Sequence, residues 1–470
     1  MQKKTRLEHD LIGEMEIPCD CYYGVQTRRA KENFKITGVA ISHSPELIKG
    51  LAHVKKAAAL ANLELGILPS NVAKAIASAC DEIIAGKLLD QFVVDVIQGG
   101  AGTSTNMNAN EVIANRALEI LGYEKGKYET VHPNNHVNLS QSTNDAYPTA
   151  FRLALHVELT KLAESMRILQ KSFAAKGVEF ADVIKMGRTQ LQDAVPMTLG
   201  QEFAAYATTM GEDVLRVIET RQLINEINMG ATAIGTGINA PPEYTRIVTQ
   251  HLRNLTGIPV VTSPNLIEAT WDTGAYVQMS GVLKRVAVKL SKICSDLRLL
   301  SSGPRAGLHE INLPPMQPGS SIMPGKVNPV IPEVVNQVAF QVIGSDVTIS
   351  FAAESGQLEL NVMEPVIAYN LFQSIDMLSR ACHVLAKKCV DGITANKEHC
   401  RELVEKSIGI VTALNPVIGY ENSTFVAQEA LQTNRSVYDI VLEKKLLTKE
   451  KLDELLSPEN MMHPRYIKND

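Results

Sequence analysis

Five long stretches with helical periodicity are the feature that most limits how this chain can fold. The first, AFRLALHVELTKLAESMRILQKSFAAKGV, contains no proline and a single late glycine. Each stretch is roughly twice as long as the usual helix of about 11 or 12 residues. Helices of that length are typical of a bundle in which each one runs along most of the body. We therefore predict long helices at 150–178, 198–228, 273–302, 331–352 and 362–391.

These stretches are apolar over a wide arc of the helix surface. In YVQMSGVLKRVAVKLSKICSDLRLL, apolar side chains occupy more than one helical stripe. A helix of this kind has to be buried on several sides. A large monomeric core would meet that requirement, and so would a bundle that is buried again against other subunits, which we favour. The predicted fold class is mainly α, with a central bundle of long helices.

The local patterns divide the chain into three predicted domains. Residues 1–141 form a mixed, mostly helical N-terminal domain, with one helix in PELIKGLAHVKKAAALANLELGIL. A second helix is expected from Ser70 or the next residue to a stop at Gly86. Residues 142–396 form the domain of the long-helix bundle. Residues 397–470 change character and predict short helices in a small C-terminal domain.

Composition and charge argue against several kinds of partner. The 470 residues carry a net charge of −5, which argues against binding to a nucleic-acid backbone. The sequence has no run of 18 apolar residues and no apolar core of a secretory signal near its start, so neither a membrane span nor export is expected. The seven cysteines form no C-x-x-C pair, so no zinc site is expected and a reduced, cytoplasmic location fits best. Cys294 and Cys382 are predicted core residues.

Four polar segments that are rich in turns interrupt the helical sequence. They read GGAGTSTNMNANE at 99–111, NNHVNLSQSTNDAYPT at 134–149, MGRTQLQDAVP at 186–196 and QPGSSIMPGKVNPVIPE at 317–333. Hydroxyls, amides, backbone N–H groups and one lysine would together suit a small dicarboxylate. The residues that could form such a site are Thr103, Ser142, Thr143, Asn144, Thr189, Ser320, Ser321, Lys326 and Asn328.

Taken singly, these segments also have structural explanations. GGAGTST fits a helix N-terminus after a tight turn, STND fits a capping sequence, and GRTQLQDAVP fits a simple turn. The connections at 228–244 and 301–329 are harder to explain in this way. Both are rich in glycine and proline, and long connections without regular structure in a compact body are usually functional.

The fourth segment is far more specific when it is read in full. GSSIMPGKVN resembles the signature of the fumarase/aspartase superfamily, and the other three segments resemble its characteristic blocks in the right order. The resemblance covers almost the whole chain, including ELNVMEPV at 359–366 and the C-terminal residues. GSSIMPGKVNPVIPEVVNQVAFQVIG is similar to the aspartase branch. Class II fumarate hydratases typically have a Cys-Glu-containing run after the Asn-Pro, and Ser-Ser-Asn in place of Ser142-Thr143-Asn144.

The resemblance implies removal of ammonia from L-aspartate to give fumarate, without a cofactor or a metal ion in the site. A base takes a proton from Cβ, and a doubly negative aci-carboxylate intermediate forms. Charge of that kind needs hydrogen-bond donors that are already aimed at it. Ser320 corresponds to the base of the family. Because an ordinary serine hydroxyl is a poor base, N–H groups of the glycine-rich loop are expected to activate it.

The resemblance also implies roles for the other residues. The donors to the intermediate would be Thr103, Ser142, Thr143 and Ser321. The α-carboxylate would be held by Lys326, Asn328 and Thr189, and the amino group by Asn144 with Thr103 and Ser142 near it. In this family such residues come from three subunits of a homotetramer whose central helices form one bundle. A tetrameric multi-helix core with shared sites is therefore expected.

One position departs from a pattern that is common in the superfamily. Many members have His after the Thr of GRT, and this chain has Gln190. Dehydration requires a proton for a hydroxide leaving group, whereas an ammonium group already carries its proton. A neutral Gln that orients a carboxylate is then sufficient. Gln190 therefore favours an ammonia-lyase over a class II fumarate hydratase, which is the alternative function.

Several other candidates carry less weight. His132 and His136 have an i, i+4 spacing that could bind a metal ion, but they flank PNN, which is not expected to be helical, and a third ligand is not evident. His309 is expected on the loop surface, and Glu364 is either close to the site or structural. Lyases with larger substrates, such as argininosuccinate or adenylosuccinate, differ in their motifs. A non-catalytic helical scaffold is a further alternative, and the complete set of site residues argues against it.

Overall fold

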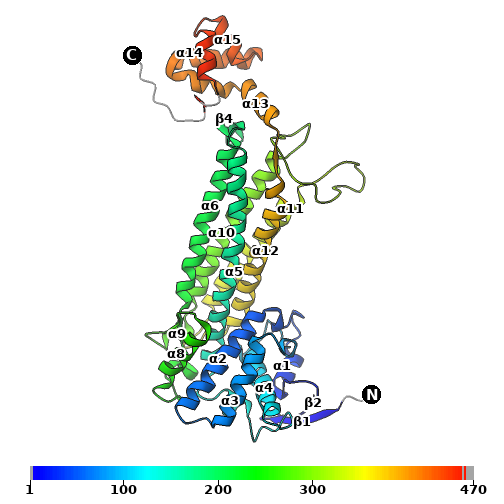
Figure 1. The fold of residues 1–470 in the computed structure, drawn as a ribbon, viewed down its shortest axis with the longest axis vertical. Helices are drawn as coiled ribbons and strands as arrows, with labels where there is room; N and C mark the ends of the chain where they lie inside the picture. The colour runs from blue at the N-terminus through cyan, green and yellow to red at the C-terminus, as the bar shows by residue number, and fades with distance from the viewer. Residues whose placement is uncertain (1–3, 458–459, 462–470) are drawn as a thin grey trace. The chain divides into compact units, whose positions relative to one another are not determined.

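The computed structural model describes residues 4–457 and 460–461 (Figure 1). Contacts between residues divide the chain into two compact units. The first unit comprises Met1–Glu164, Leu215–Ala287 and Phe340–Ser379. The second unit comprises Ser165–Val214, Val288–Ala339 and Arg380–Asp470. The division into three domains at 141 and 396 stays a prediction.

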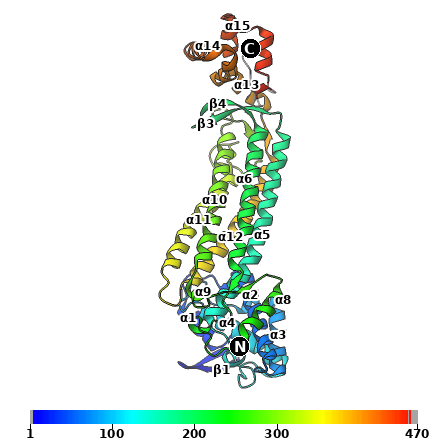
Figure 2. The ribbon, with the colours of Figure 1, turned by 90° about the vertical axis from the view of Figure 1, so that its left-hand side faces the viewer.

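The fold is mainly helical, as predicted, and the five helices that match the predicted long stretches contribute residues to both units. They lie side by side in two perpendicular views (Figures 1 and 2). All five predicted long helices are confirmed, although α5 begins earlier and α6 ends earlier than expected. Their bounds are Thr143–Glu179 (α5), Leu199–Thr220 (α6), Gly274–Leu300 (α10), Val330–Glu354 (α11) and Glu364–Lys388 (α12).

Helix α5 begins at Thr143 rather than at 150, and it passes through Pro148. A proline lacks the N–H group that would bond to the carbonyl oxygen of Asn144, four residues earlier. The Nδ2 atom of Asn228 donates to that carbonyl oxygen at 2.9 Å instead. A side chain from outside the helix thus replaces the missing backbone hydrogen bond and allows the helix to start before the proline.

Helix α6 ends at Thr220, before the predicted end at 228. One turn of 3-10 helix follows at Arg221–Ile224, and then Glu226–Ile227 (β5) pairs in parallel with Val261–Thr262 (β6). Residues that pair as a strand cannot continue a helix, so this pairing sets the end of the helical segment.

The first unit has an aromatic core between three of the long helices. Phe151 of α5 packs on Tyr276 of α10 and Phe372 of α12, with ring centroids 4.6 and 5.3 Å away. The two predicted N-terminal helices are confirmed as α2 (Pro45–Glu64) and α3 (Ser70–Ile84). The other elements are β1 (Thr5–Asp10), β2 (Gly13–Pro18), α1 (Val25–Asn33), α4 (Thr103–Ile120), α7 (Thr232–Gly235), α8 (Tyr244–Thr256) and α9 (Glu268–Trp271).

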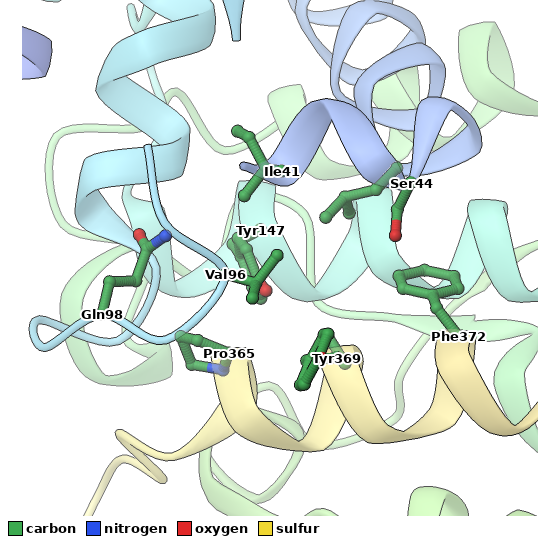
Figure 3. A pocket seen from close by; sticks show the side chains of 10 residues that line it. Ile41, Ser44, Val96, Gln98, Tyr147, Pro365, Tyr369 and Phe372 are labelled. Carbon is green, nitrogen blue, oxygen red and sulfur yellow. The ribbon is translucent and has the colours of Figure 1, made fainter. Parts of the chain in front are cut away.

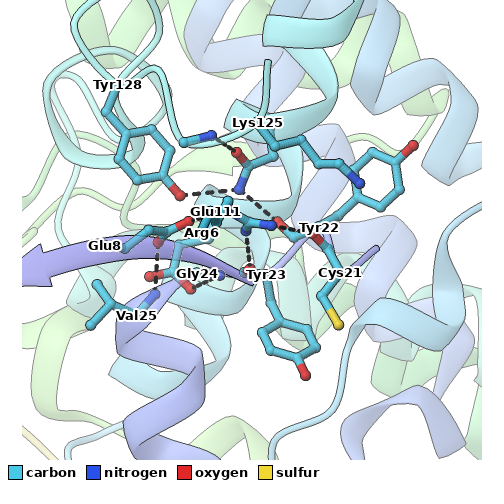
Figure 4. A network of polar contacts seen from close by, with 12 residues as sticks. Arg6, Glu8, Cys21, Tyr22, Tyr23, Gly24, Val25, Glu111, Lys125 and Tyr128 are labelled. Carbon is cyan, nitrogen blue, oxygen red and sulfur yellow. Dashed lines mark hydrogen bonds and ion pairs between the residues drawn. The ribbon is translucent and has the colours of Figure 1, made fainter. Parts of the chain in front are cut away.

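A polar network holds the first helix of this unit (Figure 4). The buried carboxylate of Glu111, on α4, accepts the backbone N–H groups of Gly24, Gln26 and Thr27 at 2.8 to 3.1 Å. These are N–H groups that a helix leaves without partners at its N-terminus. Burial raises the pKa of Glu111 to about 7, although the N–H donors favour its charged form. Glu111 therefore fixes where α1 begins relative to α4.

The second unit joins a β-hairpin to the C-terminal helices. The hairpin pairs β3 (Ile184–Thr189) with β4 (Gln192–Thr198), and Ile184 and Met186 belong to one hydrophobic cluster with apolar residues of those helices. The short helices predicted after 397 are confirmed. The remaining elements are β7 (Ile311–Asn312), β8 (Thr394–Ala395), α13 (Lys397–Lys406), α14 (Val411–Thr433), α15 (Val437–Glu443) and α16 (Lys449–Leu455).

All seven cysteines are free thiols, and Cys294 and Cys382 are buried, as predicted. Burial raises the pKa of Cys382 to about 12. Within the described residues, no helix combines the length and the apolar character that a bilayer crossing requires.

The contact between Asn228 and Asn144 predicts a stability effect that depends on Pro148. Asn228→Ala leaves the carbonyl oxygen of Asn144 without a donor and should lower the free energy of unfolding by about 1–3 kcal/mol. In a Pro148→Ala background the backbone N–H at 148 can bond to that oxygen, so the same change should cost less. Urea unfolding of the four proteins of this cycle measures the difference. Equal losses in both backgrounds would contradict the explanation.

Candidate active site

Four of the predicted site residues lie in the first unit, at the starts of two helices. Thr103 begins α4, and Ser142, Thr143 and Asn144 form the start of α5. The Nδ2 atom of Asn106, on α4, donates to Thr143 Oγ1 at 3.1 Å and so joins the two helix starts. Helix N-termini offer unpaired N–H groups and a partial positive charge, which suit a carboxylate.

Hydrogen bonds among the residues at these two helix starts orient the hydroxyl groups of Ser142 and Thr143. Ser142 Oγ accepts the backbone N–H of Asn144 at 3.2 Å, and Thr143 Oγ1 accepts from Asn106. A hydroxyl that already accepts a hydrogen bond retains its own proton for donation. Both side chains are only partly exposed. The two residues can therefore donate to a bound anion, which is the role that the resemblance implies.

Thr103 and Asn144 instead present acceptor atoms. Thr103 Oγ1 donates to the carbonyl oxygen of Gly100 at 2.7 Å, so its lone pairs remain available. Asn144 Nδ2 donates to the carbonyl oxygen of Ala233 at 2.7 Å, which leaves Asn144 Oδ1 for another donor. Such oxygens suit an ammonium group. For Thr103 this geometry agrees with a place near the amino group, and in this conformation its proton is not available to the intermediate.

The glycine-rich connection that begins at Asn228 packs against the start of α5. Asp145 is fully buried, and its two oxygens accept the backbone N–H groups of Ser142 and Gly230, each at 2.9 Å. Burial raises the pKa of Asp145 to about 6, while the N–H donors act in the opposite direction. Gly230 has a φ of 88°, and a Cβ there would lie 2.2 Å from Thr245 Oγ1, so only glycine fits.

The other predicted residues lie in the second unit, where the segment 319–328 closes on itself. Ser320 Oγ accepts the backbone N–H groups of Ile322 at 3.2 Å and Met323 at 3.0 Å. Two N–H donors on one oxygen stabilise negative charge on that oxygen. This is the arrangement expected for a serine that is activated by the surrounding loop. Ser321, the next residue, is exposed.

Gly319, Lys326 and Asn328 brace the base of this loop. The N–H of Gly319 donates to the carbonyl oxygen of Lys326 at 2.8 Å, and Asn328 Nδ2 donates to the carbonyl oxygen of Gly319 at 2.6 Å. A Cβ on residue 319 would lie 2.6 Å from the carbonyl oxygen of Lys326, so a side chain there would force the loop open. The side chain of Lys326 is exposed, and Asn328 retains its Oδ1 atom for another partner.

The loop borders a cleft of about 500 Å³ within the second unit. Lys326 and Asn328 line it together with Arg298, Ser301 and His309. Basic and hydroxyl side chains of this kind suit an anion. His309 was expected on the loop surface, and it also lines this cleft. Arg298 was not among the predicted site residues, because it lies in an ordinary helical pattern.

A hollow in the first unit is too small to be a substrate site. It lies between Ile41, Tyr147, Tyr369 and Phe372 (Figure 3) and has a volume of about 10 Å³. A space of that size holds at most one water molecule. It cannot admit a four-carbon dicarboxylate.

Thr189 and Gln190 lie at the tip of the β3–β4 hairpin, and both are exposed. Gln190 and Leu191 have φ values of 55° and 62°, so they form a tight two-residue hairpin turn in the left-handed region. Non-glycine residues pay conformational free energy there. The simple turn considered for GRTQLQDAVP is thus the end of a hairpin, which presents Thr189 and Gln190 to solvent in this chain.

Glu310, in the connection 301–329, anchors the β3–β4 hairpin to that connection. It is fully buried, and its carboxylate oxygens lie 2.9 Å from Lys185 Nζ and 2.5 Å from Arg188 Nη1. Arg188 directly precedes Thr189 in β3. Sequence reasoning missed Glu310, since a single acidic residue in GLHEIN carries no pattern that would mark it as buried.

The two histidines considered as metal ligands stabilise a turn instead. His132 Nδ1 accepts the N–H groups of Asn134 and Asn135, and His136 Nδ1 accepts the N–H of His132 at 2.8 Å. The expectation that PNN is not helical was wrong, because Pro133–Val137 forms one turn of π-helix. In the part of the chain that the structure describes, no group of three or more His, Cys, Asp or Glu residues could hold a metal ion.

Glu364 lies inside the first unit, at the start of α12. Burial raises its pKa to about 8, and the positive charge of Arg152 acts in the opposite direction. Arg152 itself donates to the hydroxyl of Tyr276 at 3.3 Å. Two roles were considered for Glu364, one close to the site and one structural. Its position among α5, α10 and α12 fits the structural role.

Comparison with known proteins gives one consistent family. A family model described as "Lyase" matches residues 13–344, and one described as "Fumarase C C-terminus" matches residues 410–463. The aspartate ammonia-lyase of Helicobacter pylori is 62% identical over 463 residues, covering 98% of this chain and 99% of that protein. The aspartate ammonia-lyase of Escherichia coli is 57% identical over 467 residues, covering 99% and 98%.

Solved structures show the same fold. A fumarate lyase:delta crystallin of Brucella melitensis, bound to cobalt, superposes with a TM-score of 0.96 at 57% identity, covering 98% of this chain and all of that one. The class II fumarase of Schistosoma mansoni superposes with a TM-score of 0.93 at 37% identity, with the same coverage. Proteins described as a fumarate lyase and as a class II fumarase therefore share this fold, so the fold by itself does not distinguish between them.

The ion pairs of Glu310 predict a large stability effect. Glu310→Ala leaves the cation of Arg188 without its buried partner and leaves Lys185 with Glu202 alone, so the free energy of unfolding should fall by about 3–5 kcal/mol. Glu402→Ala is the matched control, because it breaks only the exposed pair with Lys406 and should cost less than about 1 kcal/mol. Unfolding of both variants in urea, followed by circular dichroism, makes the comparison. Equal midpoints would refute the anchoring role.

Proposed function

The chain belongs to the fumarase/aspartase superfamily of lyases, and on that premise we propose that it removes ammonia from L-aspartate to give fumarate, reversibly. It is a carbon–nitrogen lyase. The geometric observation that carries the proposal is the Ser320 oxygen, which accepts two backbone N–H groups in a loop that also presents Lys326. The identity of 57–62% to aspartate ammonia-lyases over nearly the full chain supports this substrate.

Ser320 is the proposed base. As an alkoxide, its oxygen would take a proton from Cβ, and the electron pair of the broken C–H bond would move into the β-carboxylate to form the aci-carboxylate. Those electrons would then form the Cα–Cβ double bond as the C–N bond breaks and ammonia leaves. The N–H groups of Ile322 and Met323 lower the free energy of the alkoxide by donating to it.

The other residues bind the two ends of the substrate. Ser142 and Thr143 retain protons that they can donate to the β-carboxylate as its charge grows, and Ser321 is proposed to join them. The acceptor atoms of Thr103 and Asn144 suit the ammonium group. The α-carboxylate is assigned to Lys326, Asn328 and Thr189. Gln190 beside Thr189 would orient that carboxylate without proton transfer, which suits a leaving group that carries its own proton.

Replacing the proposed base gives the direct test. Ser320→Ala should lower kcat for fumarate formation from L-aspartate by about 10²–10⁴-fold, measured by absorbance at 240 nm. Thr433→Ala, at the exposed end of α14, should leave the rate unchanged. Fumarate given to the wild-type protein with ammonium should yield aspartate. Malate as the only product would instead identify a fumarate hydratase, and no absorbance change with any of these substrates would support a non-catalytic scaffold.

We further propose a homotetramer with sites shared by three subunits, in the cytoplasm. Helix α11 exposes Phe340, Val347 and Phe351, with 62%, 52% and 69% of their surfaces accessible. Their spacing places them on one face of the helix, and Gly344 between them leaves open space beside the backbone. An apolar face of this kind is suited to a second copy of the chain. The free thiols of all seven cysteines suit a reducing compartment.

Thr103 and Ser320 come from different segments of the chain, which makes subunit sharing testable by mixing inactive variants. Ser320→Ala and Thr103→Ala should each be inactive alone, and random exchange of subunits should restore about one quarter of the sites. Ser320→Ala mixed with Lys326→Ala is the matched control, because both residues lie on one loop and no mixed site would be intact. Activity is measured after subunit exchange has been verified. Equal activity in the two mixtures would exclude shared sites.

A further inference from the structure

Lys55, on α2, is a fully buried lysine that the proposed mechanism does not use. Its Nζ atom donates to Asn106 Oδ1 at 2.6 Å, to Asn138 Oδ1 at 2.9 Å and to Gln141 Oε1 at 2.9 Å. The three protons of the ammonium group thus have three acceptors. All of these acceptors are neutral amide oxygens, so the positive charge is solvated without being neutralised.

Buried lysines are rare, and most are paired with a carboxylate. Within the described residues, no ion pair joins Lys55 to an acidic side chain. Burial lowers the pKa of Lys55 to about 7, and the negative charge of Asp145 acts in the opposite direction. A second negative charge bound near the start of α5 would likewise favour the ammonium form. The place of Lys55 therefore suits an anion that arrives from outside the chain.

The ammonium group also sets the direction of a chain of hydrogen bonds. An ammonium group can only donate, so the Asn106 amide must turn its oxygen toward Lys55 and its NH₂ group away. That NH₂ group donates to Thr143 Oγ1 at 3.1 Å and to Asn138 Oδ1 at 3.1 Å. Because Thr143 Oγ1 accepts this bond, its own proton must point elsewhere. Without the charge, the amide could turn over and accept the Thr143 proton itself.

We propose that Lys55 is a positioning residue whose ammonium group, acting through the Asn106 amide, fixes the Thr143 hydroxyl as a donor to the negatively charged intermediate. This inference rests on the proposed function. Lys55 does not touch the substrate. It strengthens Thr143 as a donor, because a chain of hydrogen bonds that starts from a charge polarises each bond in it. The benefit is greatest where the substrate carries most charge, which is in the aci-carboxylate intermediate.

The test separates binding of the ground state from stabilisation of the intermediate. Lys55→Met should lower kcat for L-aspartate by about 10²–10³-fold, as expected for loss of an aimed donor. Inhibition by the nitronate of 2-amino-3-nitropropionate, which carries charge where the intermediate does, should weaken by a similar factor. Inhibition by succinate, a ground-state dicarboxylate, should change by less than about threefold. Lys56→Met is the matched control, since its amine pairs with Asp81 at the surface.

A second variant covers the case in which Lys55→Met does not fold. Asn106→Ala interrupts the chain but leaves Lys55 two acceptors, and it should show the same split between nitronate and succinate. Asn110→Ala is its control, because Asn110 donates to Asn138 and not to Thr143. A kcat within threefold of wild type, or equal weakening of both inhibitors, would overturn the inference. Wild-type protein that forms no fumarate would overturn the proposed function itself, which is a separate outcome.

Discussion

Asp145 is buried at the start of α5, and its two oxygens hold the backbone of Ser142 on one side and Gly230 on the other. This contact fixes three consecutive site residues, because the helix that carries them cannot start correctly unless the connection after Asn228 is in place. The same connection supplies the donor that compensates for Pro148. One half of the candidate site therefore depends on a loop that contributes no catalytic side chain.

Sequence reasoning reached most of the helices and the loop of Ser320, and the reason is physical. Long helices leave a periodic apolar pattern, and GSSIMPGKVN combines turn residues with two hydroxyl groups and a cation in one short segment. The start of α5 was placed too late, because a proline normally ends a helix and the compensating Asn228 is distant in sequence. The turn of π-helix at Pro133–Val137 was missed for a similar reason, since side-chain nitrogens rather than periodicity stabilise it.

The sequence also did not reveal which charged residues are buried. Lys55 and Lys56 are neighbours in KKAAALANLE, and composition does not distinguish them, although one is fully buried and the other pairs at the surface. Glu310 is equally inconspicuous, yet it holds two cations in the second unit. Only the packing of distant elements decides which lysine or glutamate is removed from water. Resemblance to a family indicated the residues that we propose to bind the substrate, but not the buried charged residues that hold them in place.

The donors to Ser320 belong to the main chain, since the N–H groups of Ile322 and Met323 supply them. A side chain can be lost by a single base change, whereas a backbone N–H survives every substitution except proline. The side chains of residues 322 and 323 can therefore change while the two hydrogen bonds to the Ser320 oxygen persist. The path of the backbone must be kept for these donors to remain in place. That path depends on glycine at position 319 and on the length of the loop.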